Sequence, residues 1–274
     1  MLNKDMKSLT NHSFELQQLD PSGENDFGLP PEFLQMSIDN APAIYDHSKK
    51  MMGMIIQYKE LMMMYSCALK EMRTRFEILN AEFSVRDSRN PINFINTRLK
   101  RSSSLIEKMH KIGIPISIEN IEDNIEDVAG IRVICSYVDD IYKISEALVS
   151  QKDVELISQK DYIANPKPNG YRSLHMIVRV PVHFENCMKS VKVEVQIRTI
   201  AMDFWATLEH ELKYKNRSID EDEIVAELKG CAEIISAADS KMLEIRTRVE
   251  NNSAGHSEED ILFEQIRKLD KPIE

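Results

Sequence analysis

Two acidic residues on separate predicted elements, Asp127 and Glu194, have the type and setting that chemistry on phosphates requires. Asp127 stands where a predicted helix gives way to a strand, and Glu194 lies within an alternating strand. Mg²⁺ takes hard oxygen ligands, commonly one or two carboxylates completed by phosphate oxygens, and a carboxylate can activate an attacking hydroxyl. The pair is a hypothesis for magnesium-assisted phosphoryl transfer, although acids also stand near strands in many proteins without such a site.

A basic segment between Arg86 and Pro115 would supply positive charge for the same chemistry. It holds seven Lys or Arg residues against two acids, in a chain whose net charge is −10. These side chains could hold a nucleotide polyphosphate, or they could form the solvated face of an ordinary helix. The sequence contains neither a P-loop nor a G-x-G-x-x-G pattern, so the common nucleotide cradles are not expected.

The strand that would position Glu194 is the clearest element of the sequence. Between Val191 and Thr199, apolar β-favouring residues alternate with polar ones. This period of two sends one face to a core and the other to a site or to solvent. A glycine turn and strand at 170–175 precede it and a helix at 201–215 follows it, so polar groups of three elements are close together in sequence.

The remaining elements follow from periodicity and from breakers. Apolar residues at alternating spacings of four and three predict a long packing helix over 46–83 and another from Glu221 to about 250. Between them we expect helices at 92–111, 119–127 and 141–149, and strands at 131–138, 152–162, 173–180 and 191–198. The interpretation is an α/β (α+β) fold: a mixed sheet of about five strands flanked by helices, with long N- and C-terminal helical arms. Residues 1–45 are interpreted as a flexible leader, 46–250 as the catalytic domain and 251–274 as a tail.

The net charge, the cysteines and the apolar content of the chain limit which partners it can bind and in which compartment we expect it. A net charge of −10 argues against non-specific binding of duplex nucleic acid but leaves room for a local basic pocket. The four cysteines form no C-x-x-C pair, which favours reduced thiols over zinc or disulfides. No signal peptide and no apolar window of membrane-spanning length is present. We therefore expect a cytoplasmic protein with no membrane attachment.

Five motifs in order resemble the synthetase domain of RelA/SpoT homologues, most closely the small stand-alone alarmone synthetases of the RelQ type. They are EDVAGIR at 126–132, DYI at 161–163, GYRSLH at 170–175, VEVQIRT at 193–199 and FWATLEH at 204–210. The resemblance covers roughly residues 50–250 and implies a nucleotidyltransferase-like fold. It also implies Mg²⁺-dependent transfer of the ATP β,γ-pyrophosphate to the 3′-hydroxyl of GTP or GDP, which gives pppGpp or ppGpp and AMP.

The resemblance assigns roles to residues of this chain by matching position. Asp127 and Glu194 would hold Mg²⁺, and Glu194 would activate the 3′-hydroxyl. Five residues would bind ATP, with the first two sandwiching adenine and the lysines contacting phosphates: Arg98, Arg132, Lys100, Lys108 and Lys111. Tyr171 would stack on guanine, and three further residues would contact GTP or GDP: Lys167, His175 and Gln196. Arg198 could support the site from the same strand face or form a structural ion pair.

The chain departs from the family pattern at two positions. It has Thr97 where members often place a glycine before the adenine-stacking arginine, and Asp203 where RelQ-type proteins commonly have asparagine. In that type a homotetramer binds pppGpp in a central cleft, and Phe94, Asn96 and Asp203 would lie in the corresponding region. A carboxylate at 203 would repel a polyphosphate, which argues against activation by pppGpp.

Two other functions stay open at this point. A toxic branch of the same family modifies adenine nucleotides or the 3′ end of tRNA, and a non-catalytic nucleotide sensor would need no metal-binding pair. The helical arms favour a homo-oligomer, by resemblance a tetramer. The long family members carry a hydrolase domain with a His-Asp motif; because this dipeptide is absent, we expect synthesis of the alarmone without its hydrolysis.

Overall fold

The computed structural model describes residues 31–87, 89–215 and 221–253, and the chain forms two compact units, residues 1–56 and 57–274. The described part of the first unit, 31–56, is the beginning of helix α1 (Pro31–Arg86). This helix starts well before the predicted residue 46, so the predicted leader is helical from Pro31. Residues 1–30 and the predicted tail from 254 onward lie outside the described residues.

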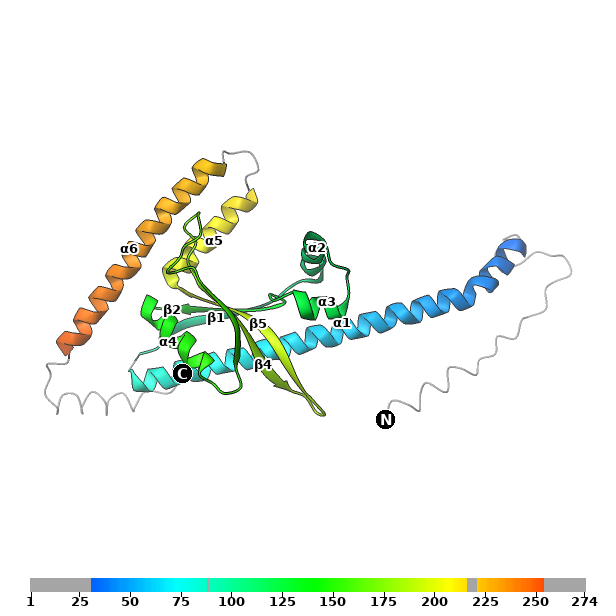
Figure 1. Ribbon diagram of the computed structural model, residues 1–274, viewed down its shortest axis with the longest axis horizontal. Coiled ribbons are helices and arrows are strands. Elements are labelled where there is room, and N and C mark those ends of the chain that lie inside the picture. Colours follow the sequence, from blue (N-terminus) through cyan, green and yellow to red (C-terminus); the bar gives the residue numbers. More distant parts are fainter. Residues whose placement is uncertain (1–30, 88, 216–220, 254–274) are drawn as a thin grey trace. The chain divides into compact units, whose positions relative to one another are not determined.

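The second unit is built on one five-stranded sheet (Figure 1). Its strands are β1 (Ile92–Leu99), β2 (Ala129–Cys135), β3 (Glu155–Asp161), β4 (Leu174–His183) and β5 (Met188–Thr199). Their order is β1-β2-β5-β4-β3, in which β2 and β5 run parallel and the other neighbours antiparallel. The predicted mixed sheet is therefore confirmed, with the Glu194 strand at its centre.

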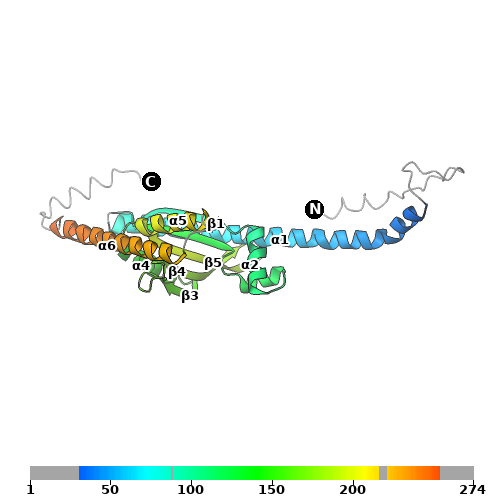
Figure 2. The same cartoon turned by 90° about the horizontal axis from the view of Figure 1, so that it is seen from above.

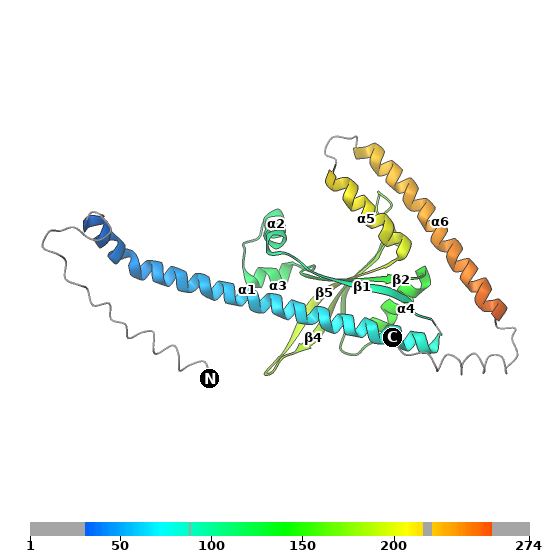
Figure 3. The same ribbon diagram turned by 180° about the vertical axis from the view of Figure 1, so that it is seen from behind.

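One face of the sheet is buried by the later part of α1 and by α4 (Val138–Val149), as the view from behind shows (Figure 3). The α1 seam predicted from four-three spacing is buried from Tyr65 to Phe83, whereas its first members, Met51 and Ile55, are exposed. It meets the alternating apolar residues of β5, of which Val193, Val195 and Ile197 are 0% exposed. Because side chains alternate along a strand, burial of these residues directs Glu194 and Gln196 to the opposite face.

The helix predicted over 92–111 is wrong in its first half. Residues 92–99 form strand β1, which pairs with β2, and only residues 102–112 form helix α2 (Ser102–Ile112). Pairing with β2 satisfies the backbone of this stretch, whose polar residues Asn93, Asn96 and Thr97 interrupt any continuous apolar helix face. Helix α3 (Ile118–Asn124) follows, with the Ser117 hydroxyl accepting the Asn120 N–H at its start.

Helices α5 (Ile200–Lys215) and α6 (Glu221–Ser253) lie side by side at one end of the sheet (Figures 1 and 2). The indole N–H of Trp205 in α5 donates to the Leu228 carbonyl of α6 at 2.9 Å. At the other end of α6, Arg246 makes two hydrogen bonds to Asp139 of α4, at 2.6 and 3.0 Å. The buried face of α6 includes Leu228 and Ala232, whereas Met242 and Val249 of the predicted seam are 53% and 59% exposed.

Within the described ranges, no helix combines the length and the apolar character needed to cross a membrane.

Candidate active site

The floor of the site is the sheet face opposite the α1 core. Residues that pair across neighbouring strands share a face, and the register aligns Arg98 of β1, Gly130 of β2 and Glu194 of β5 in one row. The next row holds Asn96, Arg132, Gln196 and His175. The strand pairing therefore brings residues of four distant segments onto one polar surface.

Asp127 lies between two lysines of the basic segment. Its carboxylate oxygens accept from Lys100 Nζ at 2.5 Å and from Lys108 Nζ at 2.6 Å. The backbone places Lys100 there, because its N–H donates to the Val128 carbonyl at 2.8 Å. Burial alone would raise the pKa of Asp127, but the two lysines outweigh it and hold the pKa below its usual range. Asp127 is thus ionised, and two lysines of the basic segment, Lys100 and Lys108, lie against it.

Glu194 has the opposite electrostatic setting. Burial, and then the negative charge of Asp127, raise the pKa of its carboxyl above the ordinary value. Its Oε2 accepts from the Gln196 amide at 3.1 Å, and its Oε1 lies 3.8 Å from Nδ1 of His175. Gly130 lies beside this carboxylate, since a Cβ built on it would be in ordinary van der Waals contact with the Arg98 carbonyl oxygen at 3.7 Å and with Oε2 at 3.8 Å.

Tyr171 follows a glycine turn and joins a cluster of aromatic rings. Its hydroxyl lies 2.7 Å from Nε2 of His175, and its ring lies 4.9 Å from the Lys167 ammonium. The same ammonium lies 4.7 Å from the ring of Tyr162, which stands edge-on to Tyr171. Burial and several nearby cations, Arg198 foremost, lower the pKa of His175 to about 4, so this imidazole is neutral at physiological pH.

Arg198 is buried, with 4% of its surface exposed, and it both forms an ion pair and supports the site. Its guanidinium donates to the Tyr171 hydroxyl at 2.5 Å, to Gln196 Oε1 at 3.0 Å and to Asp203 Oδ1 at 3.0 Å. Asp203 also forms an ion pair with Arg132 at 3.1 Å. The carboxylate at 203 is thus offset by two arginines, which the sequence did not suggest.

Most of the predicted site residues belong to this connected cluster, but two lie at its margin. Arg98 is exposed on β1, and Lys111 is exposed in the last turn of α2, where no contact within the described residues ties it to the cluster. Two members of the cluster were missed by the sequence reasoning as site residues. Tyr162 lies in the DYI motif at 161–163 but has no role predicted from it, and the sequence predicts Asp203 only as part of the effector region.

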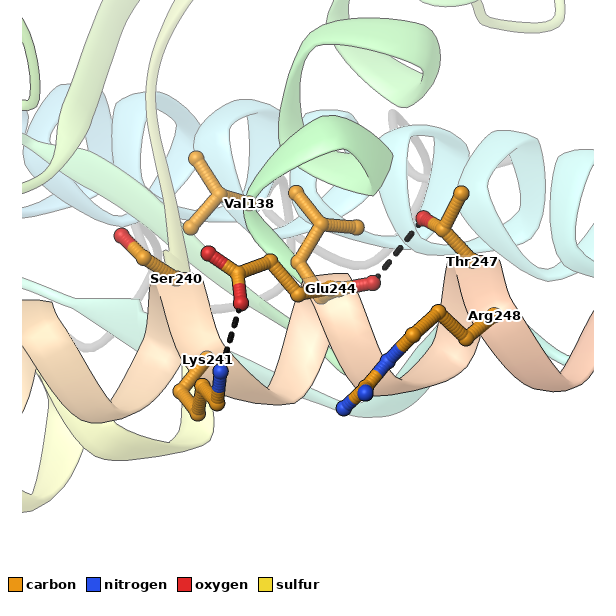
Figure 4. Close-up of a pocket in the computed structure, with 7 residues that line it drawn as sticks. Val138, Ser240, Lys241, Glu244, Thr247 and Arg248 are labelled. Atoms are coloured by element: carbon orange, nitrogen blue, oxygen red, sulfur yellow. Dashed lines mark hydrogen bonds and ion pairs between the residues drawn. The ribbon is translucent and has the colours of Figure 1, made fainter.

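A separate hollow of about 570 Å³ lies against α6 and the start of α4 (Figure 4). Two pairs of its polar groups bond each other: Lys241 pairs with Glu244 at 2.8 Å, and the Thr247 hydroxyl donates to the Leu243 carbonyl at 3.0 Å. None of the residues that line it belongs to the Asp127 and Glu194 cluster. The hollow is a surface feature beside a helix and offers no reactive group.

Comparisons with known proteins give the same picture. The family described as "Region found in RelA / SpoT proteins" matches residues 97–219. The GTP pyrophosphokinase YwaC of Bacillus subtilis is 39% identical over 204 residues, which are 74% of this chain and 97% of that protein. Small alarmone synthetase 1 of B. subtilis bound to its product pppGpp matches with a TM-score of 0.64 and 37% identity, over 70% of this chain and 98% of that chain. The same protein bound to AMPCPP matches with a TM-score of 0.59 and 33% identity, over 71% and 98%.

The sheet, its flanking helices and a site that pairs two carboxylates with lysines and arginines define a protein that handles anionic substrates. The likeness to these structures confirms the predicted fold class. The chain belongs to the RelA/SpoT family, and the relatives that it covers over nearly their whole length include small alarmone synthetases.

Proposed function

We propose that this protein is a GTP pyrophosphokinase, which transfers the β,γ-pyrophosphate of ATP to the 3′-hydroxyl of GTP or GDP. The observation that carries the proposal is the pairing of Asp127, which precedes β2 and bonds Lys100 and Lys108, with Glu194 of β5, whose pKa is raised by burial and by the charge of Asp127. The names of the matched relatives, which include GTP pyrophosphokinases, support the same reaction. The products are pppGpp or ppGpp and AMP.

The donor nucleotide would occupy the side of the sheet that carries β1, β2 and α2. There Arg98 and Arg132 would flank adenine, and three lysines would contact phosphates: Lys100, Lys108 and Lys111. A triphosphate would compete with Asp127 for Lys100 and Lys108, since both ammonium groups can donate to phosphate as well as to carboxylate.

The acceptor nucleotide would occupy the side that carries Tyr171. Its ring would stack on guanine, and Lys167, which now lies near that ring, would be available to phosphates. Gln196 and neutral His175 stand between Tyr171 and Glu194, where they would orient the ribose. The 3′-oxygen would then approach Glu194.

In the transfer, a bond forms between the 3′-oxygen and the β-phosphorus of ATP while the bond from that phosphorus to the α,β-bridging oxygen breaks. AMP leaves, and the hydroxyl proton passes to Glu194. A carboxyl whose pKa is raised by burial and by Asp127 is a stronger base than an ordinary glutamate, which suits this role.

The residues present fit Mg²⁺. Asp127 and Glu194 would supply two hard oxygen ligands, and the charge of Asp127 is close enough to Glu194 to raise its pKa. Within the described residues no group of three or more His, Cys, Asp or Glu is arranged for a metal, so phosphate oxygens of the substrate would complete the ligand shell. When bound, the ion would neutralise charge on the transferred phosphates.

The test is a product assay with purified protein, γ-labelled ATP and Mg²⁺, with GTP, GDP or tRNA as acceptor. We expect label in guanosine penta- or tetraphosphate together with an equal amount of AMP. Label in tRNA or in adenosine products would instead favour the toxic branch of the family, and no transfer would favour a nucleotide sensor. Either of these results overturns the proposal.

The helical arms would assemble the protein into a homo-oligomer, by resemblance a tetramer. The exposed Met242 and Val249 of α6 support this, because apolar residues at helical spacing favour burial against another surface. Light scattering of the purified chain measures the assembly, and a monomeric mass would contradict this part of the proposal.

A further inference from the structure

Four residues link the two sides of the site. Asp203 Oδ1 lies 3.1 Å from Nη1 of Arg132 and accepts from Nη1 of Arg198 at 3.0 Å. The other terminal nitrogen of Arg198 donates to the Tyr171 hydroxyl at 2.5 Å. The side assigned to adenine is therefore joined to the side assigned to guanine by a continuous series of polar contacts.

The middle of this series is well enclosed. The side chains of Arg198 and Asp203 are 5% and 16% exposed, whereas that of Arg132 is 38% exposed at the open end. Charge-assisted contacts strengthen as water is excluded. A change in the position of Arg198 would therefore also change the positions of Asp203 and Arg132.

The series also places like charges close together. Burial, followed by the charge of Arg198, lowers the pKa of Arg132, and Asp203 acts in the opposite direction. Without the carboxylate at 203, the two guanidinium groups would repel each other with no anion between them. Asp203 is therefore the group that permits Arg132 and Arg198 to occupy their present positions together.

We propose that Asp203 is a positioning residue that couples the donor and acceptor subsites, so that binding of either nucleotide strengthens binding of the other. This inference rests on the proposed function. A guanine stacked on Tyr171 fixes its ring and hydroxyl, and through Arg198 and Asp203 it orders Arg132. The donor nucleotide then binds a site that is already ordered, which gives positive coupling.

Titration calorimetry without turnover tests the coupling. The affinity of AMPCPP, whose methylene group replaces the oxygen at the bond to be broken, is measured with and without saturating GDP, and the reverse titration follows. For the unchanged protein we expect an improvement of about fivefold or more, equal in both directions because coupling is reciprocal. In Asp203→Ala we expect the second nucleotide to improve the affinity of the first by less than about twofold.

Two further variants make the result decisive. Asp153→Ala removes the carboxylate of another arginine pair, Arg75–Asp153 at 2.6 Å. In this variant each nucleotide should improve the affinity of the other as much as in the unchanged protein. Asp203→Asn keeps an acceptor oxygen without the charge and should give an intermediate factor; it decides the matter if Asp203→Ala does not fold.

Equal affinities with and without the second nucleotide in the unchanged protein would overturn the inference, as would full coupling in Asp203→Ala. If the unchanged protein makes labelled alarmone yet shows no coupling, this inference fails and the proposed function stands. If it makes no labelled alarmone, the proposed function itself fails.

Discussion

The hydroxyl of Tyr171 lies 2.7 Å from Nε2 of His175 and also accepts from Arg198. Because arginine can only donate, the hydroxyl is free to give its own proton to His175. Nε2 of this imidazole is then the acceptor, and its proton resides on Nδ1, which faces Glu194 at 3.8 Å. The contact between the two side chains thus orients the imidazole toward the proposed base.

Protonation of His175 should weaken the fold in mild acid. Its pKa is lowered to about 4 in the folded chain, against about 6.5 when unfolded, so the unfolded state binds the proton more readily. The stability that depends on neutral His175 is full above pH 6.5 and is lost as the pH falls toward 4, by at most about 3 kcal/mol. We expect His175→Gln to flatten this part of the curve, measured by urea unfolding at pH 7 and pH 5. If the unchanged protein and His175→Gln lose the same free energy of unfolding between pH 7 and pH 5, the prediction is wrong.

Glu194→Gln should abolish transfer while leaving ATP binding measurable. The amide keeps the shape of the side chain but cannot take a proton, and general bases contribute about 10²- to 10⁴-fold to rate. The measurement pairs turnover of labelled ATP with calorimetric binding of AMPCPP. The matched control is Glu155→Gln on β3, which breaks an exposed ion pair with Arg179 of β4. This variant should turn over ATP at the rate of the unchanged protein. Unchanged turnover in Glu194→Gln would remove this residue from the mechanism.

Gly170→Ala should disturb the turn that carries Tyr171. Gly170 has φ +89°, and an added Cβ would stand 2.5 Å from the Cβ of Ala232 in α6 and 3.2 Å from the Cα of Lys229. We expect a loss of stability greater than about 1 to 2 kcal/mol, the cost of the left-handed conformation alone, together with a raised KM for GDP.

Gly113→Ala separates backbone strain from steric overlap in this experiment. Gly113 has φ +75° but no heavy atom within 4 Å of an added Cβ. It should therefore lose only the backbone contribution and keep the KM for GDP. Equal effects of the two substitutions on urea unfolding and on KM would show that contact with α6 does not support the Tyr171 turn.

Arg246→Ala should loosen the C-terminal half of α6. This arginine bonds Asp139 at 2.6 and 3.0 Å and lies 4.7 Å from the ring of Tyr137. We expect a loss of about 1 to 3 kcal/mol, because the partly exposed Asp139 loses two charge-assisted hydrogen bonds and the buried Asp140 loses a cation at 3.8 Å. Hydrogen exchange should become faster along α6. Arg73→Ala, at an exposed pair with Glu77, should change stability by no more than about 0.5 kcal/mol. A similar small change in Arg246→Ala would show that this contact does not anchor the helix.

Periodicity predicted most of the fold because burial follows it closely. The alternation around Glu194 and the seam from Tyr65 to Phe83 correspond to buried faces of β5 and α1. The segment 92–99 could not be assigned in this way, since its strand conformation depends on pairing with β2 far along the chain. The predicted α6 seam holds in its first half, where Leu228 is buried and Ile224 and Ile235 pack against the same cluster. It fails in the second half, where Met242 and Val249 are exposed and the inward contact is made by Arg246 with Asp139.

The residues of the candidate site could be predicted from the sequence, but the hydrogen bonds and ion pairs between them could not. The family resemblance assigned roles to Asp127, Lys100 and Lys108, yet no spacing rule indicated that both lysines bond this aspartate. The contact of Asp203 with Arg132 joins side chains of α5 and β2, so it depends on how the helix packs at the sheet end. Such contacts arise from tertiary packing and leave no local signal in the sequence.

The central place of β5 bears on when the protein becomes active as it leaves the ribosome. The two pairs β1–β2 and β3–β4 each join consecutive strands and can form early, but β5 inserts between β2 and β4 and is the last strand to be made. Until then a nascent chain holds Asp127 and its lysines without Glu194. The proposed pair of carboxylates is thus completed only when β5 joins the sheet, so translation products that end before β5 would lack the proposed base.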